Sequence, residues 1–455
     1  MYDTVIIGGG PAGYLAAERL GHSGKKVLLI EERHIGGTCL NAGCIPAKTL
    51  LNSAKLYVRA KEARNFGVNA ENVSFDWQAM QSRKAEVRGK LRAGIESTMK
   101  RCGVEMINGR GEILRAVSGE YPARVRSVTP DGVCAEHEAK TLVVCAGSVP
   151  VLPPIPGAQD NPLVLDSTAL LAVQAVPKRL TVIGGGVIGV EFAGLFSALG
   201  SDVTVIEIAD EIVPFMDSEL APILRRAMKN VVFKLGCKVE KIDGAQVFCA
   251  DGTTETADSI LMAAGRRPVL DTWGAQAAGI DVKPGGVAVD DRMRTNIPGI
   301  WAAGDVTGKS LLAHSAYRMA EVAAADILGR KDRMRYNAVP WAVYGITEAA
   351  GVGITEQEAA AKGIALIKAS LPMQFSGRFA AEHTFSDAGA VKVIAGAADR
   401  RILGIHAVGP YAPEFIWGGA ALIEQEWRID DVRELIFPHP TVSELIRDLV
   451  WNMGE

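Results

Sequence analysis

The chain carries one glycine-rich unit twice, and this repeat constrains its fold more than any other feature. In the first copy an apolar strand runs into "GGGPAG", a helical segment follows, and a second strand, "KVLLIEE", ends at Glu31. The second copy, "LTVIGGGVIGVEFAGLFSALGSDVTVIE", repeats this order and ends at Glu207. Strand, glycine turn, helix and acid in this order are the fingerprint of a dinucleotide-binding βαβ unit. The alternative is a glycine-rich turn without a ligand, which the context around each copy disfavours.

The residues of each copy have separate physical roles. The first glycine permits the tight turn, the second lets the backbone approach a pyrophosphate, and the third lets the helix pack on the strand. The helix N-terminus then faces the phosphates, and the acid accepts hydrogen bonds from a ribose. These residues are Gly8, Gly10, Gly13 and Glu31 in the first copy, and Gly184, Gly186, Gly189 and Glu207 in the second. The carboxylate of Glu207 would repel a 2′-phosphate and no Arg follows it in "EIAD", so the second site should prefer NAD to NADP.

About three domains are expected for 455 residues. Downstream of each unit a strand ends in a small glycine turn, at Gly147 in "TLVVCAGSVP" and at Gly265 in "SILMAAGRRP". We interpret these turns as points where the chain passes between domains, with the Pro-rich "VPVLPPIPG" as a stiff crossing. From about residue 333 the pattern changes to alternating strands such as "AVKVIAG" and "ILGIHAV" and then a helix. The sequence therefore predicts an α/β protein with two Rossmann-like domains and a C-terminal α+β domain.

The charge and the apolar pattern exclude several kinds of partner. The 49 Lys and Arg against 52 Asp and Glu leave a formal charge of −3, which gives no sign of nucleic acid or an acidic membrane as a partner. No apolar run is long enough for a transmembrane helix, and "MYDTVIIGGG" resembles neither a signal peptide nor a transit segment. We therefore expect a cytoplasmic protein. Structural disulfides are rare in the cytosol, so a close cysteine pair there favours catalysis or metal binding.

Two of the seven cysteines, Cys39 and Cys44, lie close together in "GGTCLNAGCIPAK". In a regular helix their Cα atoms would be about 8.7 Å apart, whereas a disulfide usually requires about 4.4–6.8 Å. A bridge therefore requires an irregular turn, for which Gly43 and Pro46 are suitable. Zinc is the rival, but it requires three or four ligands, and no further cysteine or histidine stands at the usual spacing. We interpret the other five as single small hydrophobes of the core, namely Cys102, Cys134, Cys145, Cys237 and Cys249.

Four further polar residues stand in contexts that suggest chemistry. His439 lies between two prolines in "FPHPTVSE", and its charge changes near neutral pH, so it suits the proton acceptor that a dithiol requires. Glu444 could fix the tautomer of this histidine from one helical turn away. Asp305 follows the strand of "IWAAGDV", where it could bind a sugar hydroxyl or simply begin a turn. His314 opens the helix of "LLAH", whose N-terminus could stabilise negative charge.

The order of these motifs resembles that of the FAD-dependent pyridine-nucleotide disulfide oxidoreductases. The motifs are "IIGGGPAG", "GGTCLNAGCIPAK", "VIGGGVIGVE", "IWAAGDV", "LLAH" and "HPTVSE", and they span nearly the whole chain. The resemblance implies that the first nucleotide site binds FAD, that the second binds NAD, and that the last domain forms a homodimer. We accordingly predict an FAD-binding domain in two parts, 1–147 and 267–332, with an NAD-binding domain at 148–266 and a dimerisation domain at 333–455.

The resemblance also implies roles for individual residues. Cys39 and Cys44 correspond to a redox-active disulfide, in which Cys44 lies nearer the flavin and Cys39 exchanges with substrate. His439 and Glu444 correspond to the acid/base and its orienting carboxylate, which in this family reach the disulfide of the other subunit.

The resemblance also implies that several further residues lie around the cofactors. Lys48 and Glu191 correspond to a pair beside the flavin, where a cation would stabilise the reduced state, although an exposed lysine is more often simply solvated. The cofactor-binding candidates beyond the two glycine motifs are Lys48, Gly147, Gly265, Asp305 and His314. Three positions depart from the usual family pattern, namely Phe437, Ala47 and Cys145.

Within the family, the motifs are most similar to the members that oxidise dihydrolipoyl groups of carrier proteins with NAD. The expected partners are lipoyl domains of 2-oxo acid dehydrogenase complexes or the lipoyl protein of glycine cleavage. A reductase of another small disulfide is the alternative, but a glutathione-type enzyme would use NADPH and usually carries two Lys where this chain has Ala47 and Lys48. Mercuric-ion and thioredoxin reductases have an extra redox pair near the C-terminus, which "RDLVWNMGE" lacks. A non-catalytic flavoprotein scaffold is disfavoured by the intact set of Cys39, Cys44, His439 and Glu444.

Overall fold

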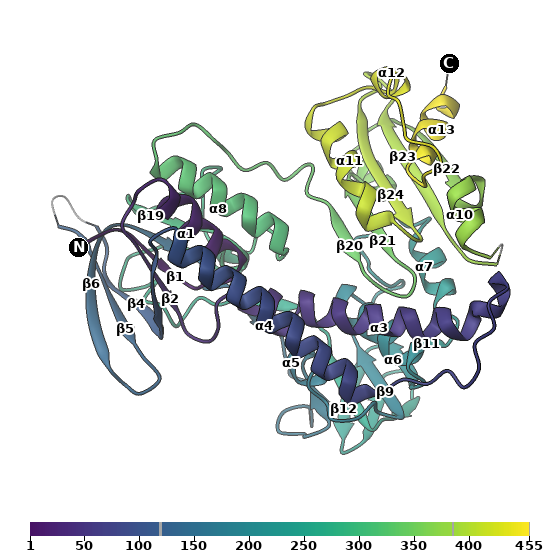
Figure 1. Ribbon diagram of the computed structural model, residues 1–455, viewed down its shortest axis with the longest axis horizontal. Coiled ribbons are helices and arrows are strands. Elements are labelled where there is room, and N and C mark those ends of the chain that lie inside the picture. The colour runs from purple at the N-terminus through teal and green to yellow at the C-terminus, as the bar shows by residue number, and fades with distance from the viewer. Residues whose placement is uncertain (118–120, 385, 455) are drawn as a thin grey trace. The chain divides into compact units, whose positions relative to one another are not determined.

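The computed structural model describes residues 1–117, 121–384 and 386–454, which form two compact units (Figure 1). Unit 1 consists of Met1–Thr49, Gln81–Val151 and Gly265–Arg335. Unit 2 consists of Leu50–Met80, Leu152–Ala264 and Tyr336–Glu455. Two long helices, α3 (Cys44–Glu62) and α4 (Trp77–Arg101), contribute residues to both units.

The core of unit 1 is a seven-stranded sheet in the order β3-β2-β1-β6-β5-β4, with β19 paired to β6 beside this path. Its strands are β1 (Tyr2–Ile7), β2 (Val27–Glu31), β3 (Glu105–Asn108), β4 (Arg110–Arg115), β5 (Ala123–Val128), β6 (Cys134–Val144) and β19 (Ile300–Ala302). The β1, β2, β3, β6 and β19 strands run parallel, and β5 pairs antiparallel with both β6 and β4. The last three residues of β1 and the first four of β2 are all apolar and buried, because both faces of a parallel sheet are covered.

Helices and short strands complete unit 1 around the first nucleotide loop. Helix α1 (Pro11–His22) packs on β1 and β2 and against α8 (Ala313–Ile327). The remaining elements are α2 (Gly37–Ala42), β7 (Ser148–Pro150), β16 (Arg266–Pro268), β17 (Val282–Lys283), β18 (Gly286–Val287) and the 3-10 turn η2 (Asp305–Thr307). The strands β7 and β16 pair with each other, and so do β17 and β18.

Unit 2 contains the second nucleotide fold, a parallel five-stranded sheet in the order β11-β10-β9-β15-β8. Its strands are β8 (Val164–Leu165), β9 (Arg179–Ile183), β10 (Asp202–Ile206), β11 (Val231–Lys234) and β15 (Ser259–Met262). An antiparallel sheet of β12 (Val239–Asp243), β13 (Gln246–Cys249) and β14 (Thr254–Thr256) accompanies it. The helical elements of this part are η1 (Ala63–Phe66), α5 (Ser167–Leu170), α6 (Val187–Ala198) and α7 (Ala221–Ala227).

The C-terminal part of unit 2 is an antiparallel sheet in the order β20-β21-β24-β23-β22. Its strands are β20 (Trp341–Val343), β21 (Ala349–Gly353), β22 (Leu366–Pro372), β23 (Ala390–Gly396) and β24 (Ile402–Val408). Helices α11 (Ala412–Glu424) and α13 (Glu444–Asn452) lie on this sheet (Figure 1). The shorter helical elements are α9 (Glu356–Ala361), η3 (Met373–Phe375), α10 (Gly377–Glu382) and α12 (Ile429–Arg433).

Successive residues of β23 serve opposite faces of this sheet, as strand geometry requires. Val391 and Val393 join the core beneath α11 and α13. Ala390 faces the other way, into a core that it shares with Val190 of α6 and Leu224 of α7. The second nucleotide fold and the C-terminal sheet therefore share a hydrophobic core within unit 2.

The predicted fold class is confirmed, with two Rossmann-like folds and a C-terminal α+β domain. The strands β23 and β24 coincide with the quoted segments "AVKVIAG" and "ILGIHAV". The domain boundaries at residues 147, 266 and 332 remain a prediction. Over the residues that the structure describes, none of the helices combines the length and the apolar character that a membrane span demands.

Candidate active site

The first glycine loop has the geometry that a bound pyrophosphate requires. Gly8 has a φ of +98°, and a Cβ at this position would lie 2.2 Å from the carbonyl oxygen of Cys145. A Cβ on Gly13 would lie 1.8 Å from the carbonyl oxygen of Gly8, so only glycine lets α1 pack this closely on β1. A Cβ on Gly10, in contrast, would meet no atom closer than 3.8 Å. Space therefore remains at the N-terminus of α1, where a phosphate would lie.

The second loop repeats this geometry in unit 2. A Cβ on Gly184 would lie 2.5 Å from the carbonyl oxygen of Ala263, and one on Gly189 would lie 1.9 Å from that of Gly184. A Cβ on Gly186 would have no neighbour within 4 Å. The space at Gly186, like that at Gly10, fits the pyrophosphate of a dinucleotide.

The acid after each second strand is fastened to its glycine loop in the same way. In unit 1, Oε2 of Glu31 accepts a hydrogen bond from the N–H of Gly9 at 2.6 Å, and Oε1 accepts one at 2.8 Å from the N–H two residues further along. In unit 2, Oε2 of Glu207 accepts a hydrogen bond from the N–H of Gly185, and Oε1 again accepts one from the N–H two residues further along, at 2.8 Å. Each carboxylate is thus held beside its loop, where an acceptor for a ribose must lie.

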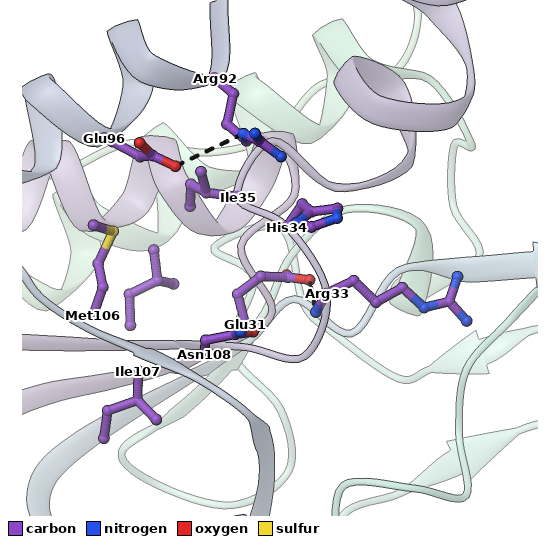
Figure 2. A pocket seen from close by; sticks show the side chains of 10 residues that line it. Glu31, Arg33, His34, Ile35, Arg92, Glu96, Met106, Ile107 and Asn108 are labelled. Atoms are coloured by element: carbon purple, nitrogen blue, oxygen red, sulfur yellow. Dashed lines mark hydrogen bonds and ion pairs between the residues drawn. The ribbon is translucent and has the colours of Figure 1, made fainter. Parts of the chain in front are cut away.

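A cavity of about 340 Å³ opens beside Glu31 in unit 1 (Figure 2). The side chains of Ile35 and Met106 supply apolar lining, and those of His34 and Arg92 supply polar groups. An apolar wall for a base, with a carboxylate for the attached ribose, suits the adenosine half of a dinucleotide. Sequence reasoning identified only Glu31 here, because the opposite wall comes from α4 and β3, far along the chain.

Asp305 lies in a half-buried hydrogen-bonded network with two residues that sequence reasoning missed. Its Oδ2 accepts a hydrogen bond from Ser148 Oγ at 2.5 Å, and that hydroxyl oxygen accepts one from Arg266 Nε at 2.8 Å. Burial raises the pKa of the Asp305 carboxyl, while the bond from Ser148 and the charge of Arg266 oppose the rise. Gly147 and Gly265 directly precede the paired strands β7 and β16, which carry Ser148 and Arg266. Asp305 begins the turn η2, as the turn interpretation predicts, whereas its binding of a sugar hydroxyl remains a prediction.

Cys39 and Cys44 are thiols that meet across a break between two helices. Cys39 lies in α2 and Cys44 is the first residue of α3. The irregular turn required by their spacing is present at Gly43, where φ is −146° and ψ is −109°, whereas Pro46 lies in the first turn of α3 and takes no part in it. The hydrogen bond with Cys44 raises the pKa of the Cys39 thiol, burial raises it further, and the charge of Lys48 opposes both. The closeness of the two sulfurs is compatible with a redox-active disulfide.

Two tyrosines that sequence reasoning missed lie in the electrostatic reach of this pair. The hydroxyls of Tyr14 and Tyr317 are hydrogen bonded, and their rings meet edge to face with centroids 5.9 Å apart. Burial and this bond raise the pKa of Tyr14, and negative charge on Cys39 raises it further. No local signal marks these residues, because α1 and α8 bring them together from distant parts of the sequence.

The other residues assigned to the flavin lie on separate elements. Lys48 follows Cys44 by one turn of α3, and His314 is the second residue of α8. Glu191 lies in α6 of unit 2, where it is buried, and its Oε1 accepts a hydrogen bond from the N–H of Tyr344 at 2.9 Å. The pairing of Lys48 with Glu191 remains a prediction.

His439 and Glu444 are in direct contact at the start of α13. Nδ1 of His439 lies 3.1 and 3.2 Å from the two carboxylate oxygens of Glu444. The carboxylate also accepts a hydrogen bond from the N–H of Thr441 at 2.8 Å and lies 3.4 Å from the guanidinium of Arg447. Burial raises the pKa of Glu444, but the bonds from Thr441 and His439 and the charge of Arg447 outweigh it, so the pKa is lowered. The His439 side chain is 79% exposed, whereas that of Glu444 is 9% exposed, so a buried anion orients an accessible imidazole.

The five single cysteines only partly follow the sequence prediction. Cys145, Cys237 and Cys249 are buried as predicted. The core prediction is wrong for Cys134, which lies in the exposed first part of β6, and for Cys102, which is half-buried. Cys237 and Cys249 are also not single, since their sulfurs lie close together.

Fold and site together define a class of protein, an oxidoreductase with two dinucleotide loops and a reactive dithiol. Residues 2–320 match the family model described as pyridine nucleotide-disulphide oxidoreductase, and residues 339–450 match the dimerisation domain of that family. The chain belongs to this family. The resemblance drawn from the motifs is thereby confirmed, and membership implies FAD and NAD as cofactors.

The curated relatives and solved structures cover essentially the whole chain. The chain is 37% identical over 467 residues to dihydrolipoyl dehydrogenase 3 of Pseudomonas putida, with 99% of this chain and 98% of the relative covered. It is 35% identical over 451 residues to dihydrolipoyl dehydrogenase of Chlamydia muridarum, with 98% and 95% covered. The crystal structure of LpdA from Mycobacterium tuberculosis matches with a TM-score of 0.92 at 28% identity, and the HOCl-induced flavoprotein disulfide reductase RclA from Escherichia coli with 0.87 at 30%. Both structural matches cover 100% of each chain.

Proposed function

We propose that this chain oxidises protein-bound dihydrolipoyl groups to lipoyl disulfides and transfers the electrons through FAD to NAD⁺. The observation that carries the proposal is the exposed His439 whose Nδ1 is held by the buried Glu444, in a chain that also has a dithiol and two dinucleotide loops. The names of the relatives that match over nearly their full length support the choice of the dihydrolipoyl group as substrate.

The proton chemistry follows from the contact between His439 and Glu444. Because the carboxylate accepts a hydrogen bond from Nδ1–H, the basic lone pair of the neutral imidazole lies on Nε2. This nitrogen accepts the proton of a substrate thiol, and the resulting thiolate is the attacking species. In the homodimer that we propose, His439 of one subunit serves the cysteine pair of the other.

Two thiol–disulfide exchanges then balance the reaction. The substrate thiolate attacks the sulfur of Cys39 in the oxidised pair, so a mixed disulfide forms and the sulfur of Cys44 leaves as a thiolate. The second substrate thiol attacks the mixed disulfide, which releases the lipoyl disulfide and leaves Cys39 reduced. The positive charge of Lys48 favours the thiolate state of the pair.

The nucleotide sites have separate tasks in this proposal. Gly10, Glu31 and Asp305 would hold FAD, and Gly186 and Glu207 would hold NAD. FAD, when bound, supplies the two-electron chemistry between the cysteine pair and the pyridine nucleotide. The partners that we propose are lipoyl domains of 2-oxo acid dehydrogenase complexes or the lipoyl protein of glycine cleavage, in the cytoplasm.

Turnover of the FAD-loaded protein with dihydrolipoamide tests the proposal. We expect reduction of NAD⁺ to exceed that of NADP⁺, because Glu207 opposes a 2′-phosphate. Cys39→Ser should abolish this turnover while NADH still reduces the flavin, and Cys134→Ser, which changes an exposed cysteine of β6, should leave turnover intact. A protein that reduces no NAD⁺ with dihydrolipoamide, or a Cys39→Ser variant that keeps its turnover, would contradict the proposal.

A further inference from the structure

A second group of metal-ligating side chains lies in unit 2, apart from the dithiol of Cys39 and Cys44. Cys237 precedes β12, Cys249 ends β13, and Asp251 lies in the turn that follows. One ligand atom of each residue lies within 4.8 Å of the corresponding atoms of the other two. Sequence reasoning assigned both cysteines to the core singly, because 11 intervening residues separate them in the printed sequence and give no usual metal-binding spacing.

Backbone hydrogen bonds hold the three residues in place. Val239 of β12 pairs with Cys249 of β13, and the N–H of Ala250 donates to the carbonyl of Lys238 at 2.9 Å, so the pairing continues towards Cys237. The N–H of Cys237 itself donates to the carbonyl of Glu207 at 2.9 Å. These bonds fix the backbone from which both cysteine side chains project.

The carboxylate of Asp251 is oriented as well. Its Oδ1 accepts hydrogen bonds from the N–H of Thr253 at 2.9 Å and from the hydroxyl of Thr253 at 2.7 Å. The nearby ammonium of Lys234 is already engaged, since it lies 2.6 Å from Glu255 and donates to the hydroxyl of Thr253 at 2.9 Å. A carboxylate held at the rim by its own turn offers an oxygen ligand with little ordering cost.

Burial differs between the ligands in a way that suits a metal ion. The Cys237 and Cys249 residues are 7% and 3% exposed and belong to an apolar cluster with Val247. Asp251 is exposed. Sulfur ligands in an apolar pocket, with an oxygen ligand at the surface, provide both a dry site and a path of entry.

The geometry favours a metal over a disulfide. Val239 is the residue opposite Cys249, so Cys237 is a diagonal neighbour, and diagonal positions are about 7–8 Å apart, beyond the usual Cα separation of about 4.4–6.8 Å for a disulfide. A tetrahedral Zn²⁺ with bonds of about 2.3 Å to sulfur holds two sulfurs about 3.8 Å apart. The third converging ligand, Asp251, would also have no part in a disulfide.

We propose that Cys237, Cys249 and Asp251 bind a thiophilic divalent cation, with water in the fourth position. Zn²⁺ is the probe for this site, because it takes cysteine and carboxylate ligands in tetrahedral geometry. The site connects the turn after β11 to the hairpin of β12 and β13. The backbone bond from Cys237 to Glu207 also links it to the end of β10.

Zn²⁺ titration of the FAD-loaded full chain tests this proposal. The background carries Cys39→Ser and Cys44→Ser, because the reduced redox pair would also bind zinc, and a phosphine keeps the other thiols reduced. We expect one equivalent of Zn²⁺ in competition with a chromophoric chelator, and a sulfur-to-cobalt charge-transfer band when Co²⁺ replaces it. Cys249→Ser should abolish both signals, and the matched control Cys134→Ser should change neither.

Asp251→Asn keeps the test independent of folding, since Asp251 is exposed and its turn tolerates an amide. Loss of an outer-sphere partner alone weakens metal binding by about 10–100-fold, so loss of this ligand should weaken Zn²⁺ by at least about tenfold. The proposal is overturned if the background binds no Zn²⁺, if binding survives Cys249→Ser or is unchanged by Asp251→Asn, or if thiol titration shows that the two cysteines form a disulfide under these reducing conditions.

Discussion

At the scale of single residues, accessibility and fixed orientation at His439 come from two different side chains. The imidazole is exposed, so it can reach a substrate on another molecule, while its orientation is set by a carboxylate that is almost fully buried. The N–H of Thr441 and the guanidinium of Arg447 stabilise that carboxylate in its ionised form. Orientation is therefore fixed inside the fold, and the chemistry remains accessible.

His439→Gln should lower turnover with dihydrolipoamide by about 100-fold or more, because general acid–base groups contribute about that much. Reduction of the flavin by NADH should be unchanged, since it requires no substrate thiol. Steady-state and stopped-flow absorbance measure the two steps separately. His22→Gln, at the exposed end of α1, is the matched control, and an equal loss in both variants would exclude a specific role for His439.

The lowered pKa of Glu444 gives a pH dependence whose sign can be worked out. A carboxyl group with a folded-state pKa below its ordinary value of 4.5 stabilises the fold fully above that pH, and loses this contribution as pH falls through the folded-state pKa. Glu444→Gln lacks the ionisable group. We expect the variant to unfold more easily than the parent at pH 7 and the difference to shrink below about pH 4.5. Denaturant unfolding at several pH values measures this, and a difference that grows on acidification would contradict it.

Residues of the site could be predicted from the sequence where they belong to one short motif. The two glycine loops, the acids Glu31 and Glu207, and the irregular turn at Gly43 all follow from spacing and residue type. Ser148 and Arg266 could not be predicted in this way, because their hydrogen bond joins positions 118 residues apart and neither residue belongs to a recognisable motif. The cluster of Cys237 and Cys249 was missed for the same reason, since only the pairing of β12 with β13 brings the sulfurs together.

At the scale of elements, helix α6 shows how closely a nucleotide fold depends on one glycine. Gly189 touches the loop that it follows, with a virtual Cβ only 1.9 Å from the carbonyl oxygen of Gly184. Gly194 lies later in the same helix, and a Cβ there would lie 3.8 Å from the nearest atom, which is ordinary contact. Within one helix, therefore, Gly189 has no room for a larger side chain and Gly194 does.

Gly189→Ala should lower the free energy of unfolding by about 1–3 kcal/mol, because the added methyl forces the helix away from the strand. Gly194→Ala should instead raise it by about 0.4–1 kcal/mol, because alanine loses less backbone entropy on folding. Denaturant unfolding of the two variants compares them directly, and NADH titration should show weaker binding only for Gly189→Ala. Equal destabilisation by both substitutions would contradict the predicted contact.

At the scale of the whole molecule, unit 2 joins the second nucleotide fold to the C-terminal sheet through a buried charge cluster as well as an apolar core. Lys392 of β23 is 1% exposed, and its ammonium lies 2.9 Å from Asp217 and 2.7 Å from Glu356. Burial lowers the pKa of Lys392, but the carboxylates raise it by more, so the lysine stays charged. The alternation along β23 predicts that Lys392 lies on the same face of the sheet as Ala390. The sequence gives no sign that acidic residues lie opposite this face.

Lys392→Met should destabilise the protein by about 3–5 kcal/mol, because it leaves the fully buried Asp217 without its counter-charge. Lys368→Met is the matched control, since Lys368 also pairs with Glu356 but its side chain is 48% exposed. That exposed pair should contribute less than about 1 kcal/mol. Thermal and denaturant unfolding measure both, and a cost of Lys392→Met as small as that of its control would contradict a structural role for the cluster.

The carboxylate of Glu207 has a consequence for attempts to redesign cofactor choice. The same group that would discriminate against a 2′-phosphate also accepts hydrogen bonds from two backbone N–H groups, one of them in the glycine loop. A single exchange of Glu207 for a basic residue would therefore loosen the loop while it removes the repulsion. Evolution or engineering towards NADP would therefore have to supply a replacement acceptor for these N–H groups together with the new positive charge.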